Sequence, residues 1–134
     1  MMLSLKSVFV FIVAPLLLMA CSTSDDEYIE IDGLVSYRTP VTLPDTAILT
    51  VKLKDITDHS QPAIIIDELN REKVTLPARF SFRVPRDELV EGHMDIIRAY
   101  VKYKDKLIFM NINAAKVRLD SSEPMLIMLE KVSE

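Results

Sequence analysis

Apolar and polar residues alternate along most of this chain from Tyr28 onward, and this two-residue period constrains its fold more than any other feature. Successive side chains of a β-strand point to opposite faces of the sheet, so a strand with one buried face shows this alternation. Residues 47–53, for example, place Ala, Leu, Val and Leu on one face and Ile, Thr and Lys on the other. The pattern predicts antiparallel strands with one face on a core and one face in water.

Seven segments carry this alternation or a short apolar run, and prolines lie between most of them. A proline between strands is well placed, because its missing N–H group would interrupt a ladder of hydrogen bonds. The predicted strands are residues 28–37, 47–56, 63–69, 78–84, 94–103, 107–113 and 125–132. We expect a tight hairpin over residues 103–107 and a short helix over residues 86–91. These elements predict an all-β fold, a single small antiparallel β-sandwich of about seven strands.

The N-terminus has a different composition from the rest of the chain. Lys6 precedes an apolar run over residues 7–18, which has the length of a cleaved secretory signal and is too short to span a bilayer comfortably. Pro15 within the run also disfavours an uninterrupted transmembrane helix. The following Leu-Met-Ala-Cys, which ends at Cys21, resembles the bacterial lipobox. In a lipobox the cysteine thiol receives a diacylglycerol, the peptide is cut before the cysteine, and the new amine is acylated.

Cys21 is the only cysteine of the chain, so it has no partner for an intramolecular disulfide bond. We predict that residues 1–20 are a cleaved lipoprotein signal peptide and that Cys21 carries a covalent diacylglycerol and an N-acyl chain such as palmitate. Several acyl chains anchor a protein stably where one would not. Because Ser22 and Thr23 lack the aspartate that favours inner-membrane retention, we expect an outer-membrane lipoprotein that faces the periplasm.

The remaining chain divides into a short tether and one domain. Residues 21–27 are small, polar and acidic after the cysteine, which predicts a flexible tether, and residues 28–134 form the predicted sandwich. The full chain has 16 basic and 20 acidic side chains, and loss of Lys6 with the signal changes its net charge from −4 to −5. This mild acidity gives no electrostatic reason to bind nucleic acid.

Residues suited to catalysis or metal binding are scarce. His59 and His93 are the only histidines, and Asp58 beside His59 forms at best a weak metal pair. Nucleotide-binding loops need glycines that a chain with two glycines lacks. Adjacent carboxylates such as Asp67 and Glu68 point to opposite faces of a strand and are poorly placed to share a proton. We therefore predict no enzyme activity, catalytic residue, metal site, small-molecule substrate or cofactor apart from the lipid.

The predicted strands at residues 107–113 and 125–132 are apolar on both faces. Burial on both sides within the sandwich explains such a strand, whereas an exposed apolar face would mark an interface with a partner. Methionine suits such an interface, because its flexible thioether adapts to an amphipathic helix. The predicted partner-contact residues are Ile108, Met110, Leu126 and Met128.

The order of several short motifs resembles the YbaY/YscW family of lipoproteins. They are Gly-Leu-Val-Ser-Tyr-Arg at 33–38, Leu-Pro at 43–44, the strand ending at Asp55, Asp-His-Ser-Gln-Pro-Ala at 58–63, Pro77 with Phe80 and Phe82, and Ile-Arg-Ala-Tyr-Val at 97–101 before the hairpin. The chain departs from the family pattern at the hairpin, where Asp105-Lys106 stands in place of Asp-Gly. The resemblance implies a lipid-anchored β-sandwich.

One branch of that family comprises pilotins of type III secretion systems, which bind the C-terminal tail of the secretin and help it assemble in the outer membrane. The resemblance thus implies a pilotin, or secretin chaperone, with the C-terminal segment of a secretin as its partner. The alternative is a general periplasm-facing envelope lipoprotein with a structural or small-ligand-binding role. A carrier of apolar ligands would show a closed cavity between its sheets, and a hydrolase would show clustered polar groups in a cleft.

Overall fold

The computed structural model describes residues 27–132 as an all-β domain, which confirms the predicted fold class. The strands are β1 (Tyr28–Tyr37), β2 (Ile48–Asp55), β3 (Ile64–Glu72), β4 (Ala78–Pro85), β5 (Asp95–Tyr103), β6 (Lys106–Met110), β7 (Ala115–Lys116) and β8 (Met125–Lys131). A short 3-10 helix, η2 (Arg86–Glu88), covers the first part of the predicted helical segment. The predicted signal peptide and Cys21 lie outside the described residues. No helix within residues 27–132 is long and apolar enough to cross a membrane.

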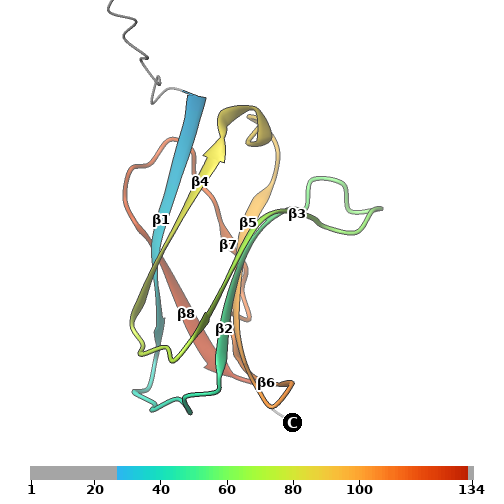
Figure 1. Cartoon of the computed structure of the whole chain (residues 1–134). Helices are drawn as coiled ribbons and strands as arrows, with labels where there is room; N and C mark the ends of the chain where they lie inside the picture. The colour runs from blue at the N-terminus through green and yellow to red at the C-terminus, as the bar shows by residue number, and fades with distance from the viewer. Residues whose placement is uncertain (1–26, 133–134) are drawn as a thin grey trace, which may run out of the picture.

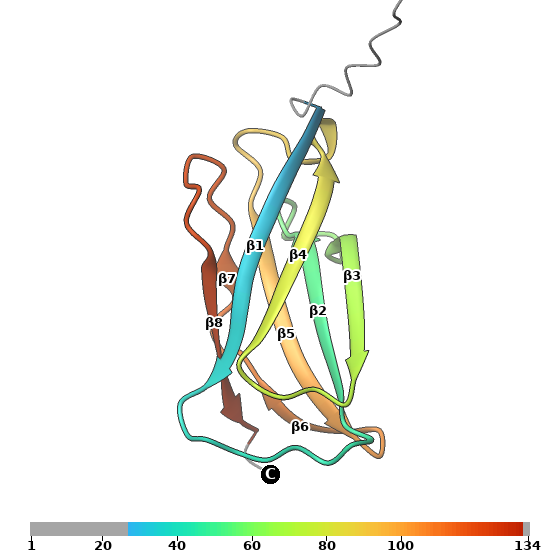
Figure 2. The same cartoon turned by 60° about the vertical axis from the view of Figure 1, so that its left-hand side comes forward.

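The strands form one path in the order β3-β2-β5-β6-β8-β1-β4, and β7 pairs with β5. Two layers are visible in Figures 1 and 2, one built on β1, β4 and β8 and the other on β2, β3 and β5. The layers are joined where the end of β8 pairs with β6. At the other side, β3 and β4 are the ends of the path. The domain is therefore a sandwich that is closed along one side, which makes it nearly barrel-like.

The pair β1–β8 is parallel, whereas every other strand pair is antiparallel. The expectation of an antiparallel sheet missed this pair, because the two-residue period records which face is buried and not the direction of the neighbouring strand. The connection from β7 to β8 spans residues 117–124, which is long enough to carry the chain between the two layers.

The core lies between the layers and follows the predicted alternation. The inward residues of β2 and β4 are almost fully buried, with Leu49 at 1%, Leu53 at 0% and Phe82 at 2% exposure. The apolar core includes Ile31, Val35, Ala47, Leu49, Val51, Leu53, Phe80, Phe82, Val84, Leu89, Ile97, Ala99, Val101, Ile127 and Leu129. Burial of each large aliphatic or aromatic side chain contributes about 1.5–3 kcal/mol.

Asn111 explains why β6 ends before the predicted strand does. Its side-chain Nδ2 donates a hydrogen bond to the Ile97 carbonyl at 3.0 Å, and its Oδ1 accepts one from the Ala99 N–H at 2.9 Å. The side-chain amide thus takes the place of a further residue of the ladder. Pairing with β5 resumes at β7, where Ala115 lies opposite Ile97, and the sequence analysis did not predict this short strand.

The predicted hairpin at residues 103–107 is confirmed. Tyr103 pairs with Lys106, so the loop consists of Lys104 and Asp105, whose φ angles are +49° and +61°. Positive φ at both positions is the requirement of a type I′ turn, in which glycine and asparagine are the usual residues. The chain adopts this turn without a glycine.

Gly33 of β1 pairs with Phe80 of β4, and the phenyl ring occupies the space above the glycine. A Cβ atom at position 33 would lie 2.3 Å from Cζ of Phe80 and 2.8 Å from the main-chain oxygen of Met125. Both distances are far below van der Waals contact. The absence of a side chain here allows β4 and β8 to pack closely on either side of β1.

We expect Gly33→Ala to lower the free energy of unfolding by about 1–3 kcal/mol, because the ring and the neighbouring backbone must move apart. Urea denaturation measures the change. Ser81→Ala, an exposed position beside Phe80, is the control and should alter stability by less than about 0.5 kcal/mol. Equal unfolding midpoints for Gly33→Ala and the wild type would contradict the close packing.

Candidate functional site

The chain crosses one end of the sandwich directly after β1. Residues 38–47, here called the crossing segment, connect Tyr37 at the end of β1 to the start of β2, as Figure 2 shows at the bottom of the view. Leu43 packs against the core, and the Ala47 N–H donates a hydrogen bond to the Pro44 carbonyl at 3.0 Å. Pro40 and Pro44 restrict the backbone further, since the proline ring locks φ.

An apolar groove of about 620 Å³ lies on one side of the crossing segment. We call it the Tyr37 groove; its apolar lining consists of Tyr37, Val41, Phe109, Ile112 and Leu129. The Tyr37 and Phe109 rings contact each other at 4.6 Å between centroids, tilted by 52°. Leu129 is 1% exposed, whereas Val41 and Ile112 are 42% and 58% exposed. Val41 and Ile112 leave apolar surface exposed at the edges of the groove, which makes it a candidate binding surface.

Ile112 is held at the groove by hydrogen bonds to the main chain around it. The Arg98 guanidinium of β5 donates to the carbonyls of Asn111 at 2.5 Å and Ile112 at 3.2 Å. Since Asn111 itself is bonded to β5, the segment that carries Ile112 is tied to the sheet at two points.

A second hollow of about 560 Å³ lies on the other side of the crossing segment. Residues 73–77, which connect β3 to β4, form its far wall. Tyr37, Arg38 and Val41 line both hollows, so the two hollows adjoin each other. We call the two adjoining hollows together the depression at this end of the sandwich.

The charged residues around this depression carry a small positive excess. Arg38, Lys73 and Lys131 line the two hollows, against the acids Asp45 and Glu130. Arg38 Nε lies 3.4 Å from Glu130 Oε1, but both side chains are partly exposed, and such a pair contributes little to stability. The local charge is +1 by this count, in a chain whose net charge is −4.

The Tyr37 hydroxyl is a polar group among the apolar residues of the groove. It is buried, and it lacks a hydrogen-bond partner among residues 27–132. Burial also raises the pKa of Tyr37 to about 12, so the hydroxyl keeps its proton at neutral pH. A buried hydroxyl without a partner costs about 1–3 kcal/mol of stability.

The structure places the four predicted contact residues on two different sides of the sheet. Ile108 packs against the core together with Phe109, because a bulge opposite β5 breaks the alternation at this point. Met110 and Met128 are half-buried, and Leu126 is 61% exposed on the face of β8 opposite the core. None of the four lines the two hollows described above.

The predicted strands thus contribute to the groove, but through neighbouring residues. Phe109 and Leu129 are their contributions, and the predicted outer-face contact of Leu126 and Met128 stays a prediction. The sequence analysis missed Tyr37 and Ile112. The signal that could have found Tyr37 is its place at the end of a strand just before a proline-containing segment, where a large aromatic side chain is left at the edge of the core.

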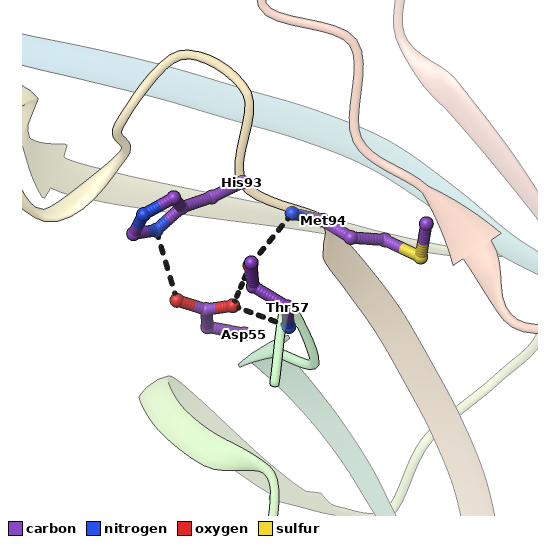
Figure 3. A network of polar contacts seen from close by, with 4 residues as sticks. All are labelled: Asp55, Thr57, His93 and Met94. Atoms are coloured by element: carbon purple, nitrogen blue, oxygen red, sulfur yellow. Dashed lines mark hydrogen bonds and ion pairs between the residues drawn. The ribbon is translucent and has the colours of Figure 1, made fainter. Parts of the chain in front are cut away.

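A network of polar contacts lies at the end of the sandwich where β2 ends and β5 begins (Figure 3). Asp55 Oδ1 accepts hydrogen bonds from the Thr57 N–H at 2.8 Å and the Thr57 hydroxyl at 2.5 Å, and Asp55 Oδ2 lies 3.1 Å from His93 Nδ1. The Met94 N–H donates to the Thr57 hydroxyl at 2.8 Å. These contacts tie the end of β2 to the loop before β5, which is a structural role.

Asp95 is a buried residue of the same region. It lies opposite Asp55 in the pairing of β2 with β5 and is 4% exposed, and its Oδ1 has no hydrogen-bond partner among residues 27–132. Burial, and then the nearby Asp55 carboxylate, raise the pKa of Asp95, whereas the hydrogen bonds from Thr57 lower the pKa of Asp55. No group of three potential metal ligands occurs within residues 27–132, and His59 is exposed.

We expect Asp95→Asn to gain stability relative to the wild type as the pH rises. A carboxyl group whose folded pKa is raised above 3.8 stabilises the fold below that pH and loses this contribution as it ionises. The free energy of unfolding of the variant minus that of the wild type should therefore increase between about pH 3 and pH 7. Urea denaturation at several pH values measures this difference. Asp120→Asn, at an exposed loop position, controls for loss of one negative charge, and a pH-independent difference for Asp95→Asn would contradict the expectation.

Comparisons with known proteins agree with a binding role. A family model described as the type III secretion system lipoprotein chaperone (YscW) matches residues 27–128. The structure is also similar to that of an alternative pilotin from the type II secretion system of Vibrio cholerae, with a TM-score of 0.69 and 26% sequence identity. The similarity covers 80% of this chain and 99% of the pilotin. A search of curated proteins finds no match.

The family match spans most of the chain. It includes strands β1 to β7 and the first residues of β8. It confirms the resemblance that the order of motifs indicated. This chain belongs to the YscW family of type III secretion lipoprotein chaperones.

Proposed function

We propose that this protein is an outer-membrane pilotin that binds the C-terminal segment of a type III secretion secretin and promotes its localisation and assembly in the outer membrane. The observation that carries the proposal is the match to the lipoprotein chaperone family over residues 27–128. The likeness to a pilotin of a second secretion system adds support, because it concerns nearly the whole length of that protein.

Binding to a partner, and not catalysis, is the activity that the Tyr37 groove supports. Its lining is mainly apolar, with Val41 and Ile112 exposed at its edges, which suits the apolar face of an amphipathic helix. Buried apolar side chains occupy the space between the two layers, and the groove opens at the end of the sandwich. This arrangement favours a peptide segment over a small apolar ligand enclosed between the sheets.

The direction of β1 places the proposed anchor and the groove at opposite ends of the domain. The strand begins at one end of the sandwich and ends at Tyr37 beside the groove, at the opposite end (Figures 1 and 2). Its ten residues span about 30 Å at the usual rise per residue. A lipid on Cys21, shortly before β1, would attach the first end to the membrane. The groove would then lie at the end of the domain far from the attachment point, where an unassembled secretin segment is accessible.

We expect Ile112→Asp to weaken binding of a peptide with the sequence of the secretin C-terminal segment by at least about tenfold, which corresponds to about 1.4 kcal/mol. A carboxylate at the edge of the groove would oppose burial of the apolar face of the peptide. Fluorescence anisotropy with the labelled peptide measures the affinity. Leu126→Asp is the matched control, because Leu126 has a similar exposure of 61% but lies outside the groove.

The pair of variants separates the two candidate surfaces. Loss of binding in Leu126→Asp alone would place the site on the outer face of β8. If both variants bound the peptide as tightly as the wild type does, the groove would be excluded as the binding site. Failure of the wild-type protein to bind the peptide would contradict the proposed function itself. A peptide from a type II secretin, tested in parallel, examines the specificity for type III secretion.

A further inference from the structure

The strand β3 is paired on one side only. It is one end of the strand path, so no strand within residues 27–132 pairs with its second edge. Figure 2 shows β3 at the right-hand margin of its layer. An unpaired edge presents main-chain N–H and C=O groups to which a further strand can bind. The free edge of β3 is therefore a candidate surface for a partner.

The main-chain groups on this edge can be assigned to particular residues. Successive residues of an antiparallel strand turn these groups alternately toward one neighbouring strand and the other. The Glu68 N–H donates a hydrogen bond to Oδ1 of the adjacent Asp67 at 2.8 Å, so this N–H is not part of the ladder with β2. Glu68, and by alternation Asn70 and Glu72, therefore offer their main-chain groups at the free edge. The side chains of these three residues are exposed.

The other residues of this stretch carry charges on the side of the core. Asp67 lies opposite Leu53 and Arg71 lies opposite Leu49, and both leucines are buried core residues. Opposite residues of a ladder point to the same face, so Asp67, Leu69 and Arg71 point toward the space between the layers. Inward-pointing charges keep unrelated strands from an edge, because a strand that pairs there must supply matching charges.

A second copy of β3 supplies both matching charges. When two copies pair antiparallel with Leu69 opposite itself, Asp67 of each copy lies opposite Arg71 of the other. This pair of opposite charges occurs twice, and such cross-strand pairs are stabilising. Glu68 then lies opposite Asn70, so the main-chain groups that face the free edge meet as hydrogen-bonded pairs.

The other symmetric pairings of the stretch bring like charges together. Pairing centred on Asp67, Glu68 or Arg71 would place that charged residue opposite itself. Pairing centred on Asn70 would place Glu68 opposite Glu72. Like charges directly opposite each other are destabilising. The charges of β3 thus favour a single register for a pair of identical strands.

Both charged side chains can make the contact between copies. The Arg71 guanidinium already donates to the main-chain oxygen of Arg79 in β4, and its five N–H donors leave others for a carboxylate. Asp67 is released from the Glu68 N–H when that group binds the Asn70 carbonyl of the second copy.

We propose that two copies of this protein pair antiparallel through β3, around a two-fold axis at Leu69, with Asp67 of each copy bound to Arg71 of the other. The layer of β2, β3 and β5 then continues into the second copy as one sheet. Because the axis is perpendicular to this sheet, the β1 strands of both copies lie on the same side of it, which is compatible with attachment to one membrane. The inference goes beyond the proposed function and does not depend on it.

Charge reversal on the full chain in detergent solution tests the pairing. Sedimentation equilibrium over a series of concentrations measures the dissociation constant of the dimer. We expect Asp67→Arg and Arg71→Asp each to raise this constant at least about tenfold, because each variant places two pairs of like charges across the interface. The combined variant Asp67→Arg/Arg71→Asp restores opposite charges and should return the constant to within about threefold of the wild type. Asp120→Arg, at an exposed loop position, is the control and should leave it unchanged.

Three results would overturn the proposal. They are a wild type that stays monomeric over the whole series, a combined variant that dimerises no better than the single ones, and particles larger than a dimer, because a two-fold pairing closes on itself. Each result concerns the mass of the particle and leaves binding of the secretin segment as a separate question.

Disulfide formation under mild oxidation tests the register independently. In the proposed pair, Leu69 faces its own copy as a non-hydrogen-bonded pair with a Cα separation of about 4.5 Å, which a disulfide can span. Leu69→Cys should therefore give a linked dimer on a non-reducing gel. The wild type, with Cys21 as its only cysteine, and Glu72→Cys, which is far from its own copy in this register, should not. Equal linking of Leu69→Cys and Glu72→Cys, or no linking of Leu69→Cys, would contradict the register.

Discussion

The double pairing of β8 is the interaction on which the rest of the structure depends. Its first residues pair in parallel with β1 and its last residues pair with β6, so this one strand joins the two layers of the sandwich. The same pairing sets Leu129 opposite Tyr37 and Lys131 opposite Phe109. The Tyr37 groove lies where β8 passes from one layer to the other. The same pairing of β8 therefore closes the sandwich and brings together the residues of the candidate site.

The two ends of the domain have different characters as a result. At the end where β1 begins, polar contacts among Asp55, Thr57 and His93 tie two loops together and leave Asp95 buried beneath them. At the end where β1 finishes, apolar side chains remain partly uncovered beside the crossing segment. Such a division suits the proposed function, in which the chain is anchored at one end and binds a partner at the other. A similar fold occurs in the alternative pilotin from the type II secretion system of Vibrio cholerae.

Local sequence pattern predicted the strands well, because alternation depends only on which face is buried. Predicted strand 28–37 coincides with β1, and the buried faces of β2 and β4 are those that the pattern indicated. Features that depend on distant pairs were not predictable in this way. The parallel partner of β1, the contact between Asp55 and His93, and the stop of β6 at Asn111 all involve residues far apart in the sequence.

The candidate site shows the same limit. Apolar character on both faces drew attention to β6 and β8, and Phe109 and Leu129 of these strands line the Tyr37 groove. Ile108, a predicted contact residue, packs against the core together with Phe109 because of a bulge. Tyr37 and Ile112 are brought together by the closure of the sandwich, which no local pattern records. The order of the short motifs indicated the family, which spacing and composition alone could not do. The family match confirmed that assignment.

Secretin assembly in a strain that lacks this gene tests the central claim most directly. Membranes would be fractionated and examined for heat-resistant secretin multimers, with the strain complemented by the wild-type gene or by Cys21→Ser. The account predicts that multimers disappear or collect in the inner membrane, and that only the wild-type gene restores them, because the variant lacks the proposed lipid attachment site. Normal outer-membrane multimers in the deletion strain would contradict the account and favour a general envelope lipoprotein.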